Sequence, residues 1–167
     1  MTDDTIYEER VSSDWTEALF LGLTILFFLL YRWLLSTGGP LFLRAAFFVL
    51  SLFFLFHSLN YRTLVIRLTP ESLKLKFGIF TWRIPLDNIG ECQLDELPKL
   101  MWYGGAGIHF MLIRKRYRAS FNFLEHSRVV IAFKRKVGIV QDISFSTRRP
   151  DDVIQLLQDV ISAQNTA

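Results

Sequence analysis

Two apolar segments dominate the amino-terminal part of the chain: WTEALFLGLTILFFLLYRWLL at Trp15–Leu35 and LFLRAAFFVLSLFFLFHSL at Leu41–Leu59. Each approaches the roughly 20 residues that an α-helix needs to cross about 30 Å of hydrocarbon. Only Ser36-Thr37-Gly38-Gly39-Pro40 separates them, so the helices are expected to fold back on each other as an antiparallel hairpin. Apolar side chains point in every direction around both helices, as is typical of a surface that faces lipid. Residues 15–59 therefore predict a two-helix transmembrane hairpin.

A pair of buried core helices in a soluble protein is the alternative interpretation. The strictly uncharged stretches, Ala18–Tyr31 and Ala45–Phe56, are short enough for core helices. Neither helix has a polar stripe, however, and aromatic rings such as Trp15 and Trp33 stand near the ends, where they settle at the headgroup level. Residues 1–14 are acidic rather than basic, so we expect an amino-terminal tail and not a cleaved signal peptide.

The flanking basic residues predict the orientation of the hairpin. Arg32 and Arg44 lie beside the turn, whereas five basic residues flank the other ends of the helices: Arg10, Arg62, Arg67, Lys74 and Lys76. The excess of Lys and Arg on cytoplasmic segments then places both termini in the cytoplasm. The single cysteine, Cys92, forms no intrachain disulfide, in agreement with a reducing compartment.

The chain after Asn60 alternates apolar and polar residues with a period of two, which indicates half-buried β-strands. About seven short antiparallel strands are predicted, at residues 64–68, 73–77, 80–84, 89–94, 108–123, 129–135 and 139–147. The period then changes. Pro150 suits a first helical turn, and an apolar stripe from Val153 to Ile161 follows at helical spacing. We expect one carboxy-terminal amphipathic helix that covers an all-β domain.

Several turn and core motifs of this region resemble those of a known family: YRTLVIRLT at Tyr61–Thr69, SLKLKFG at Ser72–Gly78, IPLDNI at Ile84–Ile89, GAGI at Gly105–Ile108 and ISFST at Ile143–Thr147. With the preceding hairpin, the chain resembles the bacterial PH-like (pleckstrin-homology-like) membrane proteins. The resemblance implies a cytoplasmic PH-like barrel over residues 61–162, a short tail at 163–167, and a binding or scaffolding role at the inner membrane.

A basic cluster is the candidate lipid-binding site. On a strand predicted at Ile113–Phe123, Arg114, Arg116 and Arg118 would share one face about 7 Å apart. Lys134 and Lys136 add further positive charge. A row of fixed cations near an anionic leaflet favours lipid headgroups, at about 1 kcal/mol for each residue, over nucleic acid. The alternative is a solvated strand face whose charges prevent edge-to-edge aggregation.

A second candidate site is the apolar loop Leu100, Met101, Trp102 and Tyr103, which follows Pro98. At a loop tip it would enter the membrane interface or bind a partner protein. Packed on the sheet, it would be part of the core. The sequence leaves both interpretations open.

No motif predicts catalysis, a metal or a cofactor. His57, His109 and His126 lie in three different contexts and lack metal-ligand spacing with one another or with Cys92. Gly104–Gly107 lacks the Gly-Lys-Ser/Thr ending of a phosphate-binding loop. The predicted function is therefore non-catalytic binding or scaffolding at the bilayer, with anionic headgroups, a membrane-protein partner or a second copy as ligand. The alternative is an accessory subunit of a membrane enzyme or transporter, which a cleft that gathers Asp87, Asp95, His109 and Arg114 would favour.

Overall fold

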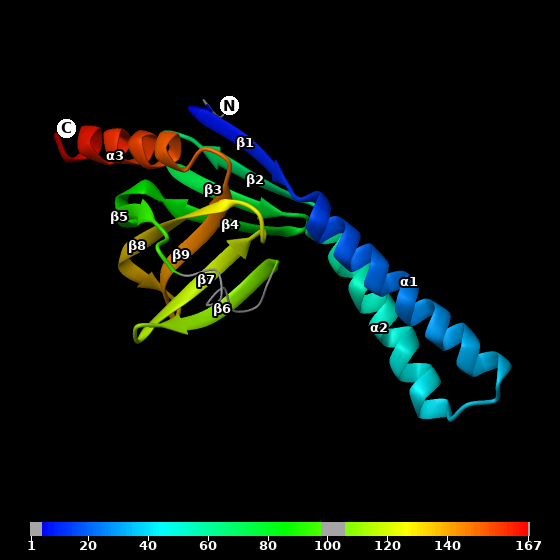
Figure 1. Cartoon of the computed structure of the whole chain (residues 1–167). Helices are drawn as coiled ribbons and strands as arrows, with labels where there is room; N and C mark the ends of the chain where they lie inside the picture. Colours follow the sequence, from blue (N-terminus) through cyan, green and yellow to red (C-terminus); the bar gives the residue numbers. More distant parts are fainter. Residues whose placement is uncertain (1–4, 98–105, 167) are drawn as a thin grey trace.

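A computed structural model describes residues 5–97 and 106–166, with a helical rod projecting from a β-rich domain (Figure 1). The helices are α1 (Asp14–Ser36), α2 (Leu41–Asn60) and α3 (Pro150–Thr166), with one 3-10 turn, η1 (Leu86–Asn88). The strands are β1 (Tyr7–Ser12), β2 (Thr63–Leu68), β3 (Ser72–Phe77), β4 (Phe80–Pro85), β5 (Ile89–Leu94), β6 (Gly107–Ile113), β7 (Arg116–Asn122), β8 (Ser127–Val137) and β9 (Val140–Thr147).

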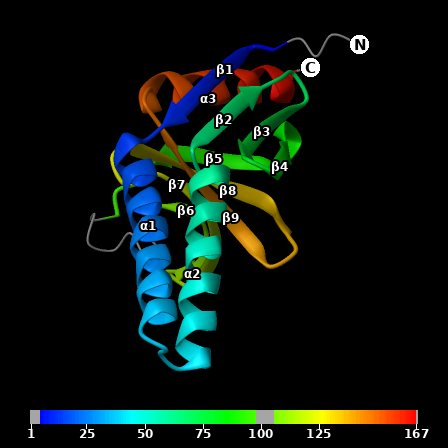
Figure 2. The ribbon, with the colours of Figure 1, turned by 90° about the vertical axis from the view of Figure 1, so that its right-hand side faces the viewer.

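Helices α1 and α2 form the predicted antiparallel hairpin and lie side by side (Figure 2), and the hairpin projects away from the β domain (Figure 1). Ser13 caps α1, because its hydroxyl oxygen accepts a hydrogen bond from the Thr16 N–H at 3.0 Å. Aromatic rings hold the helices together, with Phe27 and Phe54 stacked at 5.4 Å between ring centroids. Both helices are long and apolar enough to cross a bilayer, and few of their residues are buried within the protein. The coarse prediction of two spanning-length apolar helices is confirmed.

The helical hairpin is inserted between two neighbouring strands of one sheet. Strand β1 pairs antiparallel with β2, and Ser12 lies opposite Thr63. Only Ser13 separates β1 from α1, and only Tyr61 and Arg62 separate α2 from β2. The expectation that residues 1–14 form a tail is wrong for Tyr7–Ser12. YEERVS contains one aliphatic residue, so its strand character depends on a partner some fifty residues away.

In the described part of the chain, nine strands form two sheets, rather than the seven strands predicted. One sheet has the order β1-β2-β3-β4 and is antiparallel throughout; the other has the order β5-β8-β9-β7-β6. In the second sheet β7 and β9 run parallel, and the remaining pairs are antiparallel. Within the described residues no ladder joins the two sheets, so they do not close into a barrel.

The domain core lies between the two sheets and under α3. Its fully buried residues include Leu64, Ile66, Leu75, Phe77, Ile84, Phe121, Phe123, Ile131, Ile143 and Phe145. Helix α3 begins at Pro150, as predicted, and packs on β5, β8 and η1. It buries Val153 and Leu157. The apolar stripe of α3 therefore closes one end of the core, and the predicted single carboxy-terminal helix is confirmed.

The junction between the helical hairpin and the domain is tightly packed around Asn60 and Gly78. The Asn60 side-chain oxygen accepts a hydrogen bond from the Ile79 N–H at 3.3 Å. Gly78 has a φ of +54°, and a Cβ there would lie 2.6 Å from the Asn60 carbonyl oxygen. Gly78 therefore permits both the left-handed turn between β3 and β4 and the close approach of that turn to the end of α2.

We expect Gly78→Ala to destabilise the protein by about 2–4 kcal/mol, because strain at positive φ adds to backbone overlap with Asn60. Gly138→Ala is the matched control, since Gly138 has a φ of +61° and open space around its Cβ position. It should cost only the strain, about 1 kcal/mol. Thermal unfolding of the purified proteins in detergent measures both; equal losses of Tm would show that the Asn60 contact contributes nothing.

Candidate functional site

Of the three arginines predicted to share one strand face, Arg116 and Arg118 share a face of β7, whereas Arg114 lies outside the strand. Strand β6 ends at Ile113 and β7 begins at Arg116, so the chain reverses between them. Arg114 and Lys115 form the turn, with φ values of 49° and 67°. Two positive φ angles are typical of the tight turns that join antiparallel strands, which usually contain Asn or Gly. Because neither residue is present here, the sequence gives no turn signal and suggests one long strand.

Arg116 and Arg118 are ion-paired with carboxylates of neighbouring strands. The Arg116 Nη2 atom lies 2.7 Å from Asp142 Oδ1 on β9. The Arg118 Nη1 atom lies 3.4 Å from Asp95 Oδ1, and its Nη2 atom lies 3.9 Å from Asp142 Oδ2. Arg118 is also mostly buried. These two guanidinium groups are therefore largely offset by charges within the domain.

A fifth member of this network, Arg128, was not predicted from the sequence. Its side chain is 1% exposed, and its Nη2 atom lies 2.9 Å from Oδ2 of Asp95, which is 4% exposed. We call Arg116, Arg118, Arg128, Asp95 and Asp142 the buried charge cluster, in which Arg116 is the most exposed member, with 45% of its side chain accessible. In the sequence, Arg128 lies between a loop and the apolar run VVIAF, which indicates only that a strand starts there. Its ion-pair partner, Asp95, is distant in the sequence.

The buried charge cluster ties together strands from across the second sheet. Burial lowers the pKa of the Arg128 guanidinium, and the negative charge of Asp95 opposes that change. An arginine nevertheless stays protonated at neutral pH, so Asp95 is needed as its counter-charge. The Asp95 backbone N–H also donates to the Arg128 carbonyl oxygen at 2.8 Å, which extends the β5–β8 ladder. The cluster is thus a structural element of the sheet.

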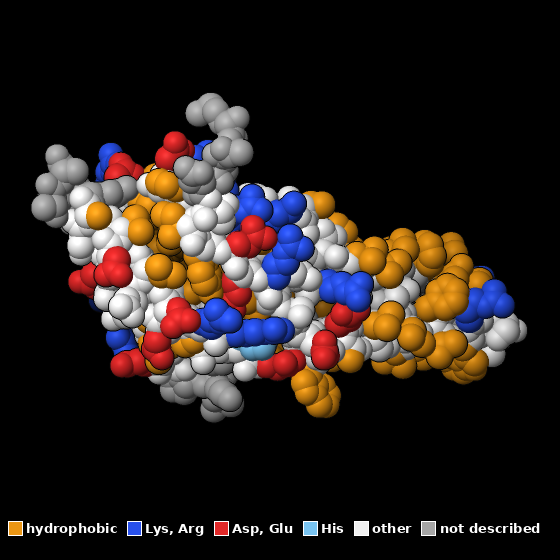
Figure 3. Space-filling model, turned by 90° about the horizontal axis from the view of Figure 1, so that it is seen from above, with side chains coloured by type: hydrophobic (Ala, Val, Ile, Leu, Met, Phe, Trp, Pro, Cys, Tyr) orange, Lys and Arg blue, Asp and Glu red, His pale blue; other side chains and the backbone are white. Residues whose placement is uncertain are grey.

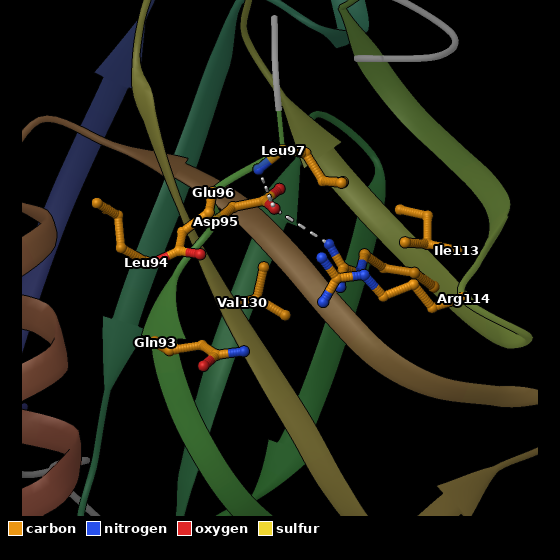
Figure 4. Close-up of a pocket in the computed structure, with 9 residues that line it drawn as sticks. Gln93, Leu94, Asp95, Glu96, Leu97, Ile113, Arg114 and Val130 are labelled. Atoms are coloured by element: carbon orange, nitrogen blue, oxygen red, sulfur yellow. Dashed lines mark hydrogen bonds and ion pairs between the residues drawn. The ribbon is translucent and has the colours of Figure 1, made fainter.

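A small pocket of about 150 Å³ opens beside this cluster (Figure 4). Its charged lining consists of Arg114 and Arg118, against Asp95 and Glu96, so the four formal charges cancel. Asp95 also accepts a hydrogen bond from the Leu97 N–H at 3.3 Å. A pocket of this size is well below the roughly 300 Å³ of ordinary small-molecule sites. The geometry does not favour it as an anion-binding site.

The other predicted site residues lie elsewhere. Lys134 and Lys136 are exposed near the end of β8, and this end lies on the side of the domain away from the helical hairpin in Figure 1. Between them, Arg135 pairs with Asp87 at 3.0 Å. Whether these lysines bind lipid stays a prediction. Leu100, Met101, Trp102 and Tyr103 lie outside the described residues.

Another basic surface, not singled out from the sequence, covers the outer face of the β1–β4 sheet. We call it the basic sheet face; it consists of Arg10, Arg67, Lys74 and Lys76. These residues line a shallow cleft of about 220 Å³. Glu8 contacts two of them, Arg67 at 2.8 Å and Arg10 at 3.3 Å. Figure 3 shows Lys and Arg side chains gathered beside the base of the apolar helical hairpin.

The sequence did contain a signal for this surface. Lys74 and Lys76 alternate with buried Leu73, Leu75 and Phe77, so their side chains point outward from β3. The register then aligns Lys76 with Val65 and Arg10 across three strands. Only the pairing of β1 with β2 brings Arg10 into the group, because that strand precedes the helical hairpin in the sequence.

The residues considered for catalysis have structural surroundings. Ring nitrogens of His57, His109 and His126 each lie 2.9 Å from a backbone carbonyl oxygen. Burial raises the pKa of the Cys92 thiol to about 12, so the reactive thiolate is disfavoured. Asp95 and Arg114 line one pocket, whereas Asp87 pairs with Arg135 elsewhere. Within residues 5–97 and 106–166, no three His, Cys, Asp or Glu side chains form a group suited to a metal ion.

Comparisons with protein-family models, curated proteins and solved structures give no match for this chain. Function is therefore inferred from the fold, the charges and the exposed surfaces.

We expect Asp95→Asn to reduce the free energy of unfolding by about 3–5 kcal/mol, because Arg118 and Arg128 would lose their shared buried counter-charge. Asp87→Asn is the matched control. It makes the same substitution in a pair whose side chains are 66% and 76% exposed, so it should cost about 1 kcal/mol or less. Thermal melting and expression level measure the difference, and similar effects of both substitutions would contradict a structural role for the cluster.

Proposed function

We propose that this protein is a non-catalytic, membrane-anchored binding and scaffolding module whose β domain contacts anionic lipid headgroups. One observation carries the proposal: the apolar helical hairpin continues into β1 and β2 through junctions of one and two residues. Such short junctions, each within a packed and hydrogen-bonded region, hold the domain at the end of the helices. Any cations on the adjoining strands then stay near the leaflet from which the helices emerge.

The basic sheet face supplies cations in the required place. Its residues lie on β1, β2 and β3, and β1 and β2 are the strands that run directly into α1 and α2. All four basic residues are at least partly exposed, and Arg67 and Arg10 also contact Glu8. Near an anionic surface each basic residue contributes about 1 kcal/mol of attraction. This surface therefore supports headgroup binding better than the arginines of the buried charge cluster do.

The orientation is part of the same proposal. Arg10, Arg67, Lys74 and Lys76 all belong to the β domain, whereas Arg32 and Arg44 lie on the helices toward their connecting turn. By the bias of Lys and Arg toward cytoplasmic segments, the β domain and both termini lie in the cytoplasm of a bacterial cell, with the hairpin in the inner membrane.

A relationship to the PH-like membrane proteins also stays a proposal. Two packed sheets and one carboxy-terminal helix that covers an end of the core support it. The parallel pair β7 and β9, and a strand that precedes the helical hairpin, are features that the resemblance did not predict. The alternative role as an accessory subunit has no supporting cleft among the described residues.

Topology can be tested with single cysteines at Thr37, in the exposed turn between α1 and α2, and at Ser162, exposed on α3. An impermeant thiol reagent added to intact cells should label Thr37→Cys and leave Ser162→Cys unlabelled until the cells are opened. Buried Cys92 should stay unlabelled in both proteins because burial disfavours its thiolate. Labelling of Ser162→Cys from outside would reverse the proposed orientation.

Headgroup binding can be tested with two matched pairs of lysines. Lys74→Gln/Lys76→Gln alters β3 of the basic sheet face, and Lys134→Gln/Lys136→Gln makes the same change with the same spacing on β8. At about 1 kcal/mol for each charge, the β3 double variant should lose roughly 30-fold in affinity for phosphatidylglycerol. The β8 double variant should bind as the wild type does. Native mass spectrometry of the detergent-solubilised full chain measures retained phosphatidylglycerol against phosphatidylcholine.

The full chain is required in this experiment, because a protein that begins at Tyr61 would lack β1 and expose the edge of β2. Loss of phosphatidylglycerol from the β8 double variant alone would favour the lysines predicted from the sequence. No preference in the wild type, or an unchanged preference in both double variants, would contradict headgroup binding by the domain.

A further inference from the structure

An apolar groove separates the edges of the two sheets beside the helical hairpin. It has a volume of about 400 Å³, and its apolar lining is Tyr61, Phe80, Trp82, Ile108, Phe110 and Phe121. The indole of Trp82 forms one wall, with its ring centroid 6.4 Å from that of Phe110 and 6.3 Å from that of Phe121. The described lining contains no charged side chain.

The groove exists because the two sheets diverge at this side of the core. Strands β4 and β6 are each the last strand of their sheet, so neither sheet extends over the other here. Ile108, Phe110 and Leu112 alternate along β6 and therefore share one face. The same face of the neighbouring strand carries Phe121, which is fully buried in the core. Farther along the same face of β6, Phe110 and Leu112 are 62% and 60% exposed, so residues 5–97 and 106–166 leave these two side chains largely uncovered.

One end of the groove adjoins the helical hairpin. Tyr61 directly follows α2, and its ring centroid lies 5.0 Å from that of His57 in the last turn of that helix and 6.3 Å from that of Phe80. Gly107, the first residue of β6, lies so close to Tyr61 that a Cβ would be 3.1 Å from its ring. Ile79, in the turn before β4, is 72% exposed and hydrogen-bonded to Asn60. Apolar surface thus continues from the end of α2 into the groove.

We propose that this groove binds a hydrocarbon chain of a lipid from the adjoining leaflet. The inference rests on the membrane anchoring in the proposed function, but not on the choice of headgroup. The volume falls within the range of about 300–1,000 Å³ that is usual for small-molecule sites. A lining without charged side chains suits an acyl chain. The groove also adjoins the apolar helical hairpin, which in the proposed arrangement is surrounded by the acyl chains of the membrane. The basic sheet face and the groove would then contact different parts of the lipid layer.

Trp82 provides a direct probe of the groove. In the full chain, Trp15, Trp33 and Trp102 are replaced by Phe, and the protein is placed in nanodiscs of phosphatidylcholine whose chains are brominated near their methyl ends. Those bromines lie deep in the bilayer, so they reach Trp82 only when a chain enters the groove. We expect Trp82 fluorescence to fall by about half relative to nanodiscs of unbrominated lipid.

Phe110→Lys places a charge at the groove on a largely exposed position and should restore most of the Trp82 fluorescence. Ile139→Lys is the matched control: Ile139 is 66% exposed in the β8–β9 turn, and the change should leave quenching intact. A second protein, in which all four native tryptophans are replaced by Phe and Phe28→Trp places one tryptophan near the middle of α1, reports whether the hairpin is inserted, so failed anchoring is distinguished from an empty groove. Because the lipid is uncharged, a failure of headgroup binding would not affect the result.

Quenching in the Phe28→Trp protein without quenching of Trp82 would overturn the proposal, as would equal quenching in the Phe110→Lys and Ile139→Lys proteins. An unquenched Trp82 in a protein that is dimeric in nanodiscs, with the dimer lost on Phe110→Lys, would instead assign the groove to a second copy of the chain.

Discussion

The backbone ladder between β1 and β2 is the constraint on which the arrangement of the molecule depends. These strands pair from Tyr7 opposite Leu68 to Ser12 opposite Thr63, and the whole helical hairpin lies between them in the sequence. Helices α1 and α2 therefore join the sheet at neighbouring ends of two paired strands, through junctions of only one and two residues. Val11, fully buried, anchors the otherwise polar β1 in the core. The β1–β2 ladder joins the apolar hairpin and the β domain into one continuous unit.

Positive charge has two separate roles in this domain. In the buried charge cluster, three guanidinium groups share two carboxylates, and the geometry serves to hold β7, β8 and β9 with the end of β5. Such pairs are costly to break because a lone buried charge has neither water nor a partner. On the basic sheet face, Arg10, Arg67, Lys74 and Lys76 are all at least partly exposed on the outer side of the sheet. Their charges can therefore act on an external anion more readily than those of Arg118 and Arg128, which are mostly buried.

Both candidate surfaces arise at the limits of the two sheets. The basic sheet face is the side of the β1–β4 sheet that faces away from the core, where strand alternation places Arg67, Lys74 and Lys76. The apolar groove lies where β4 and β6 end their sheets without pairing to each other in the described structure. A closed barrel would have joined those edges and covered Phe110 and Leu112. The incomplete closure is thus what creates a surface suited to an apolar ligand.

Local patterns in the sequence were sufficient to predict the helices and strands whose residue pattern is contained within a short stretch. The all-round apolarity of α1 and α2, the alternation in β2 to β4 and the helical stripe after Pro150 each reflect contacts between one face of an element and its surroundings, so periodicity predicts them. Strand β1, the Arg114–Lys115 reversal, the pairing of Arg118 and Arg128 with Asp95, and the groove beside Tyr61 were decided by the tertiary structure. In each of these features, either the stabilising partner lies far away in the chain or the turn lacks its usual residues. Hydrogen bonding, charge pairing and the divergence of the sheets depend on distances between such remote segments, and no local pattern encodes those distances.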